Sequence, residues 1–140
     1  MSVYLDASVI IPTLVTDSAS ATVEAFLLAN VEEIVVSDFC AAEVASAFSR
    51  LVRTGDLTTI DASARLAVFD QWCALDAQMV DVEPADIRAT GALVRQFHLM
   101  LRAPDALHIV ITRRLTSTMV TRDQRMARVF AVLGLPTILL

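Results

Sequence analysis

The sequence contains no lysine, and all 11 of its basic residues are arginine. Together with 16 acidic residues they give a formal net charge of −5, which argues against a protein that grips nucleic acid through a broadly basic surface. Guanidinium groups suit paired contacts with phosphate and carboxylate, but a GC-rich genome produces the same preference for arginine. The absence of lysine therefore decides little by itself.

Glycine and proline are also scarce, with 3 and 4 residues among 140. Hydrophobic residues make up 56% of the chain, and the mean hydropathy is +0.62. This composition excludes a disordered or fibrous chain and is typical of a globular protein. Because 140 residues are enough to bury one core but not two, we expect a single domain over residues 1–140.

Long hydrophobic runs are missing as well. The longest uncharged stretch, residues 129–140, is far shorter than the roughly 20 residues that a membrane-spanning helix needs. The N-terminus has no basic segment and reaches an acid at Asp6, unlike a secretory signal. We therefore expect a cytoplasmic protein without membrane association.

Only two cysteines occur, Cys40 and Cys73, and both have apolar neighbours. They show neither the spacing of a zinc site nor that of a CxxC redox motif. We expect both to be buried, reduced thiols.

Short runs rich in β-branched residues alternate with longer stretches of helical spacing. The runs predict strands at 3–5, 34–36, 79–82, 118–120 and 137–139, and the stretches predict helices at 18–30, 38–54, 58–77, 84–98, 104–116 and 124–133. Capping and turn residues at Ser37, Gly55, Pro84, Pro104 and Gly134 support these divisions. The alternation predicts an α/β fold, a three-layer sandwich with a mainly parallel central sheet flanked by helices.

Four acidic residues stand where an open parallel sheet binds its ligands, beyond the carboxyl ends of the strands. Asp6 and Asp123 follow predicted strands, Glu43 lies one turn into a helix, and Asp105 opens another helix. Three have a purely structural alternative: Asp6 and Asp123 as helix N-caps, and Asp105 as a first-turn acid favoured by the helix dipole. Glu43 has apolar neighbours on its helix face and needs a partner if that face is buried.

Four carboxylates that converge on one cleft cannot all stay ionised without a cation. The chain has no lysine for this purpose, and its two histidines lack ligand-type spacing. A hard divalent ion with oxygen ligands fits best: one or two Mg²⁺ ions, with Mn²⁺ as an alternative. Such a site suits phosphodiester hydrolysis, because the metal activates a water molecule and stabilises the charge that develops on the phosphate oxygens.

The segments that carry these acids resemble the PIN domain of VapC-type toxin ribonucleases. They read Leu-Asp-Ala-Ser at 5–8, Ala-Ala-Glu-Val at 41–44, Pro-Asp-Ala-Leu-His at 104–108 and Val-Thr-Arg-Asp at 120–123, so that the likeness covers nearly the whole chain. The resemblance implies a PIN-like fold and a Mg²⁺-dependent ribonuclease that hydrolyses RNA. It also implies the toxin of a VapBC-type toxin–antitoxin pair, with a VapB-like antitoxin as partner and a homodimer as assembly.

The same resemblance implies roles for individual residues. Asp6, Glu43, Asp105 and Asp123 match the catalytic, metal-binding acids of the family, and Ser8 and Thr121 match its hydroxyl neighbours, which orient metal-bound water or phosphate. With these four acids neutralised by metal, the rest of the chain is close to neutral and does not repel RNA.

Three arginines adjoin the acidic motifs in the sequence: Arg102, Arg122 and Arg125. They are candidates for contacts with RNA phosphates. The alternative is that each is solvated or pairs with a nearby acid.

His108 lies in an apolar helix one turn after Asp105, and we interpret it as a packed or hydrogen-bonded residue rather than a general base. The high apolar content predicts that some apolar surface stays uncovered in an isolated chain. We expect it to contact a second copy through large residues of the second and third predicted helices, namely Phe48, Leu51, Val52, Phe69 and Trp72. A base-stacking platform is the alternative for Phe69 and Trp72.

Two other function classes remain to be weighed. A haloacid-dehalogenase-like phosphatase needs a second Asp where this chain has Ser8, and a receiver domain needs a late lysine, so both fit poorly. A non-cleaving PIN-fold module that binds RNA is the non-enzymatic alternative, against which the intact set of four acids argues.

Overall fold

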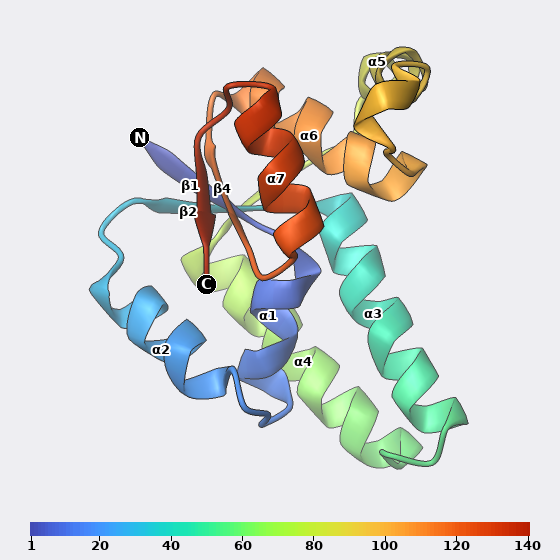
Figure 1. Cartoon of the computed structure of the whole chain (residues 1–140). Coiled ribbons are helices and arrows are strands. Elements are labelled where there is room, and N and C mark those ends of the chain that lie inside the picture. The colour runs from blue at the N-terminus through green and yellow to red at the C-terminus, as the bar shows by residue number, and fades with distance from the viewer.

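The computed structural model describes all 140 residues and contains one sheet of five parallel strands in the order β3-β2-β1-β4-β5 (Figure 1). The strands are β1 (Ser2–Leu5), β2 (Glu33–Ser37), β3 (Gln78–Val80), β4 (Thr118–Thr121) and β5 (Thr137–Leu139). The helices are α1 (Ala7–Leu14), α2 (Ser20–Ala29), α3 (Asp38–Arg53), α4 (Thr59–Asp76), α5 (Pro84–Val94), the 3₁₀ helix η1 (Phe97–Leu99), α6 (Ala103–Leu115) and α7 (Gln124–Val132). Every pair of neighbouring strands is parallel, which confirms the predicted α/β class.

Two hydrophobic cores lie on the two faces of the sheet, because successive side chains of a strand point to opposite faces. In β1, Val3 and Leu5 pack in the core formed with α1 to α4, whereas Tyr4 between them packs in the core formed with α5, α6 and α7. Figure 1 shows these two groups of helices on opposite sides of the sheet. The predicted three-layer sandwich is therefore confirmed.

Helix α1 occupies residues for which the sequence predicts no helix, because β-branched residues and Pro12 disfavour one. Pro12 has no N–H group to offer the carbonyl of Ser8, and Nη1 of Arg122 donates to this carbonyl instead, at 3.4 Å. Val9 and Ile10 are buried in the core. Tertiary packing thus stabilises a helix that intrinsic propensity does not favour.

Most predicted element ends lie within two residues of the observed ones, and two of the differences have a clear cause in tertiary contacts. β3 ends at Val80 instead of at 82, and α5 ends at Val94 instead of at 98. Nη2 of Arg114 donates to the carbonyl of Asp81 at 2.9 Å, which engages this backbone group outside the sheet. After α5 the chain turns so that Leu99 enters the core.

Helices α5 and α6 are joined by an ion pair in which the acid is buried and the arginine is partly exposed. Nε and Nη2 of Arg114 each donate to one oxygen of the Asp86 carboxylate at 2.9 Å, and Nη1 lies 3.0 Å from Glu83. Asp86 is only 2% exposed. These contacts raise the pKa of Arg114 above its ordinary value, chiefly through the hydrogen bonds to Asp86.

The prediction of apolar contact residues is wrong for Phe48 and Phe69. Both are buried in the core on the side of α1 to α4, because their positions on α3 and α4 face the sheet. Val52 and Trp72 pack against the same core and are half-buried, and Leu51 is half-buried as well. The same burial excludes the base-stacking alternative for Phe69.

Cys40 and Cys73 are buried and free, as expected. None of the helices combines the length and the apolar character that crossing a bilayer requires.

Candidate active site

The strand order places a topological switch point between β1 and β4 at the carboxyl edge of the sheet. The chain leaves β1 for α1 on one face, and it leaves β4 for α7 on the other face. In α/β proteins, ligands bind at such a switch point. Asp6 directly follows β1, and Asp123 follows β4 by two residues.

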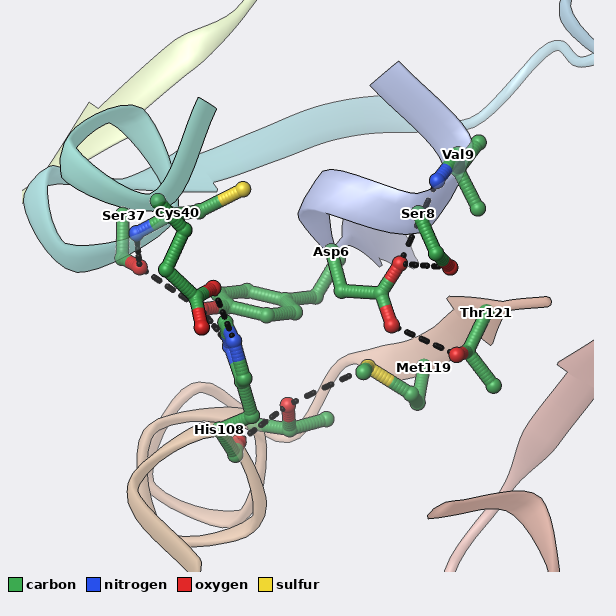
Figure 2. A network of polar contacts seen from close by, with 11 residues as sticks. Asp6, Ser8, Val9, Ser37, Cys40, His108, Met119 and Thr121 are labelled. Atoms are coloured by element: carbon green, nitrogen blue, oxygen red, sulfur yellow. Dashed lines mark hydrogen bonds and ion pairs between the residues drawn. The ribbon is translucent and has the colours of Figure 1, made fainter. Parts of the chain in front are cut away.

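Asp6 is 5% exposed and forms no ion pair, so its carboxylate is buried without a cationic partner. Its Oδ1 accepts hydrogen bonds from the Ser8 hydroxyl at 2.5 Å and from the Val9 amide at 3.3 Å, and its Oδ2 accepts one from the Thr121 hydroxyl at 2.5 Å (Figure 2). Burial raises the pKa of the Asp6 carboxyl above its ordinary value, although the bonds from Ser8 and Thr121 oppose this shift.

Ser8 and Thr121 also tie the loop after β1 to the loop after β4. The Ser8 hydroxyl oxygen accepts a hydrogen bond from the Arg122 amide at 2.9 Å, and the Thr121 hydroxyl oxygen accepts one from the Asp123 amide at 3.0 Å. Each hydroxyl therefore accepts from one backbone amide and donates to Asp6. The two residues that the sequence singles out as hydroxyl neighbours lie directly on the buried carboxylate.

Asp123 is the N-cap of α7. Its Oδ1 accepts hydrogen bonds from the amides of Arg125 at 2.8 Å and Met126 at 3.2 Å, whereas its Oδ2 makes no hydrogen bond within the protein. The structural alternative considered for Asp123, and likewise for the N-cap Asp6, is therefore real. It leaves one oxygen of Asp123 free for another ligand.

Glu43 contacts His108 across the gap between α3 and α6. Its Oε2 lies 2.7 Å from Nε2 of His108, and Nδ1 of His108 lies 2.8 Å from the Tyr4 hydroxyl. The Tyr4 hydroxyl lies 2.6 Å from Ser37 Oγ, which accepts a hydrogen bond from the Cys40 amide. His108 is 3% exposed, which confirms its interpretation as a packed, hydrogen-bonded residue.

The direction of this hydrogen-bond chain depends on the tautomer of His108. In the tautomer that carries its proton on Nε2, His108 donates to Glu43, and its Nδ1 accepts from the Tyr4 hydroxyl. Tyr4 then accepts from Ser37, and every donor in the chain points toward Glu43. Burial raises the pKa of Tyr4 well above its ordinary value, which keeps this hydroxyl protonated.

Asp105 lies in the first turn of α6, with its side chain 16% exposed. Nε of Arg102 lies 3.4 Å and Nη2 of Arg125 lies 3.7 Å from its Oδ2. The two arginine side chains are 68% and 62% exposed, so they keep further donors free. Arg122, the third arginine of interest, instead contacts the Ser8 carbonyl and lies 3.9 Å from Asp17.

The four acids lie at one edge of the sheet, and short polar connections link three of them, Asp6, Asp105 and Asp123. Thr121 joins Asp6 to the Asp123 loop, and Arg125 contacts both Asp105 and Asp123. Burial raises the pKa of the Cys40 thiol well above its ordinary value. The negative charges of Asp6 and Glu43, which lie near this thiol, raise the pKa further. No group of three or more acidic, histidine or cysteine side chains is close enough to enclose a metal ion.

The donor set nevertheless fits a hard cation. Asp6 offers a buried carboxylate without a counter-charge, which is costly unless an ion compensates it. Asp123 has a free oxygen beside it, and Asp105 and Glu43 supply further carboxylate oxygens at the same edge. All these ligands are of the type that Mg²⁺ and Mn²⁺ prefer.

The sequence of residues 3–131 matches the PIN domain family. The matched segment includes all four acids and every strand except β5. The chain belongs to the PIN domain family. No curated protein matches the sequence closely enough to add a relative.

Several solved structures share the fold along 90% or more of the chain. VapBC2 from Rickettsia felis, bound to promoter DNA, matches with a TM-score of 0.73 at 15% identity, covering 100% of this chain and 99% of that one. VapC20 from Mycobacterium tuberculosis, a sarcin-ricin-loop-cleaving toxin, matches with 0.71 at 16% identity, covering 90% and 93%. FitAcB from Neisseria gonorrhoeae matches with 0.69 at 17% identity, covering 97% and 96%.

Proposed function

We propose that this PIN domain is a Mg²⁺-dependent ribonuclease. The observation that carries the proposal is the buried, unpaired carboxylate of Asp6 at the switch point of the sheet, with Asp123, Asp105 and Glu43 at the same edge. The N-cap role of Asp6 does not require a buried carboxylate without a counter-charge, because residues such as Ser or Asn cap helices too, whereas a cation-dependent hydrolase needs the charge.

Mg²⁺, or Mn²⁺ in its place, would be held by Asp6, Glu43, Asp105 and Asp123. When bound there, it supplies a polarised water molecule and charge stabilisation at the phosphodiester. Other side chains of the protein position the four acids. Ser8 and Thr121 each donate a hydrogen bond to the Asp6 carboxylate and so fix its orientation. We therefore assign the two hydroxyls to positioning this carboxylate rather than to orienting metal-bound water or phosphate.

His108 positions Glu43 in the same manner, because the directed chain from Cys40 through Ser37 and Tyr4 ends on the Glu43 carboxylate. Arg102 and Arg125 reduce the negative charge at Asp105 and keep N–H donors for RNA phosphates. Arg122 is engaged with the α1 loop, which makes it a structural residue first.

A non-cleaving PIN module that binds RNA is the competing proposal, and one experiment separates the two. Purified protein is incubated with single-stranded RNA in Mg²⁺, in EDTA, and in EDTA followed by excess Mg²⁺. The ribonuclease proposal expects cleavage in the first and third reactions and none in the second. RNA that stays intact in all three while remaining bound supports the non-cleaving module.

The toxin role is a further part of this proposal. The similar structures also include a toxin–antitoxin complex from Klebsiella pneumoniae and a DNA-bound VapBC from Salmonella typhimurium. By analogy we propose a VapB-like antitoxin as the partner of this chain and a homodimer as its assembly. Sedimentation of the purified chain tests the dimer, which has twice the 15.2 kDa mass of one copy.

A further inference from the structure

A groove of about 530 Å³ opens beside Asp105, between η1, the start of α6 and the outer face of α7. Its volume lies in the range of about 300–1,000 Å³ that is usual for small-ligand clefts. Asp105 is the one residue that the groove shares with the acidic edge of the sheet, so that any molecule in the groove lies next to the candidate active site. We call it the α7 groove.

The charge of the α7 groove is opposite to that of the whole chain. Three arginines, Arg102, Arg125 and Arg128, line it together with a single carboxylate, Asp105, although the chain carries a net charge of −5. Arg128 forms no ion pair and no hydrogen bond with its side chain, and it is exposed. Arg102 and Arg125 share the one carboxylate of Asp105, so the three guanidinium groups exceed the negative charge of the groove and favour an anionic ligand, phosphate above all.

The rest of the groove is apolar. Six of its 11 lining residues are hydrophobic, and two of them present large exposed side chains, with Met100 at 86% and Val132 at 66% exposure. Met100 also adopts a left-handed backbone conformation with φ of 51°, which is unfavourable for a residue other than glycine. Strained residues of this kind concentrate at binding sites.

Apolar surface bordered by arginines is the combination that recognises an unpaired nucleotide. A base presents a flat apolar face, and its flanking phosphates present negative charge, so single-stranded RNA is bound by stacking and electrostatic contacts together. A base in a duplex is already paired and stacked, and it cannot enter a groove of this kind without being extruded.

We propose that the α7 groove binds one unpaired nucleotide of the RNA substrate, immediately beside the phosphodiester that the acidic site cuts. The base packs against Met100 and Val132, and the arginines, Arg128 in particular, contact its phosphates. This inference rests on the proposed ribonuclease function. It assigns a substrate preference for single-stranded RNA at this side of the cleavage point.

The test measures RNA binding in EDTA, where metal-dependent cleavage does not proceed. A short, fluorescein-labelled, uridine-rich oligonucleotide is titrated by fluorescence anisotropy, alone and annealed to its complement. Arg128→Gln is compared with Arg88→Gln, an exposed arginine on α5 outside the groove, and Val132→Asp with Val31→Asp, a valine 94% exposed in the loop before β2. Circular dichroism and thermal melting verify that all four variants fold.

The proposal expects the single strand to bind more tightly than the duplex. It expects Arg128→Gln to weaken binding about 5-fold or more and to lower the slope of affinity against salt by about one unit, with Arg88→Gln close to wild type. Val132→Asp should weaken binding more than Val31→Asp. Photo-crosslinking with 4-thiouridine RNA should label peptides containing Met100 or Val132.

Four outcomes would overturn the proposal: groove variants that bind like their controls, equal affinity for single strand and duplex, crosslinks confined to other elements, or variants that dissociate a dimer while RNA binding stays unchanged. The last would show that a second copy covers the groove. Wild-type cleavage in Mg²⁺ with groove-insensitive binding removes this inference and leaves the ribonuclease. Groove-dependent binding without cleavage removes the ribonuclease and leaves an RNA-binding groove.

Discussion

Oε2 of Glu43 lies 2.7 Å from Nε2 of His108, and this contact joins α3 to α6 across the carboxyl edge of the sheet. The opposite ring nitrogen of His108 holds the hydroxyl of the buried Tyr4. Glu43 is thereby oriented by a core residue rather than by solvent, which is how protein side chains hold a metal-binding carboxylate in place.

Removal of the imidazole should break both contacts. We expect His108→Ala to lower the free energy of unfolding by about 3 kcal/mol, because it leaves a cavity and a buried tyrosine hydroxyl without its acceptor. Tyr4→Phe should cost less, and the double variant should show a coupling energy of about 1 kcal/mol in urea denaturation. Strictly additive effects would mean that the two side chains do not interact in solution.

The raised pKa of Asp6 predicts a dependence of stability on pH without metal. Because the folded protein holds the Asp6 proton more tightly than the unfolded chain does, the ionised carboxylate destabilises the fold, and stability is lost as the pH rises from the ordinary value of 3.8 through the folded pKa. In EDTA at neutral pH, Asp6→Asn should therefore melt a few degrees above wild type. The gain should vanish below pH 3.8. A variant that melts lower than wild type at neutral pH would contradict the cost assigned to this carboxylate.

The ion pair between Arg114 and Asp86 should contribute to stability because breaking it leaves a buried charge. We expect Arg114→Gln to cost about 3 kcal/mol, at the lower end for buried pairs since the Arg114 side chain is 29% exposed. Arg88→Gln, which removes an equal charge from exposed α5, should stay within about 0.5 kcal/mol of wild type. Equal effects of the two substitutions in denaturant titrations would show that net charge, and not this pair, matters.

Metal binding should appear as a gain in stability by mass action. Millimolar Mg²⁺ should raise the melting temperature of the wild type and raise that of Asp105→Asn less, because the variant lacks one carboxylate ligand. The matched control is Asp70→Asn, an exposed acid on α4, which should respond like wild type. An unchanged melting temperature of the wild type with Mg²⁺ would argue against a formed metal site.

Much of the fold can be predicted from local patterns in the sequence, since composition and spacing indicate buried strands and capped helices. The α1 helix does not, because Pro12 and its β-branched neighbours oppose a helix locally, and what stabilises it is distant in sequence: Arg122 on the Ser8 carbonyl and burial of Val9. The early ends of β3 and α5 likewise depend on tertiary contacts of Arg114 and Leu99.

The candidate site divides in the same way. Its four acids and two hydroxyl residues are recognisable from their motifs, and the strand order brings them to one edge. The sequence does not reveal which side chains of the site contact one another. Glu43 and His108 are 65 positions apart, and only the folded structure shows that this histidine contacts the carboxylate. Arg128 adjoins none of the acidic motifs, so the sequence alone gives no reason to assign it a function. Its position in the α7 groove does.

The central claim is that the four acids form one catalytic metal site, and single-turnover cleavage of RNA in Mg²⁺ tests it most directly. The account predicts that Asp6→Asn, Glu43→Gln, Asp105→Asn and Asp123→Asn each slow cleavage about 100-fold or more, equivalent to about 2.7 kcal/mol of transition-state stabilisation, while Asp70→Asn cleaves at the wild-type rate. Cleavage at the wild-type rate by two or more of the four variants would contradict it.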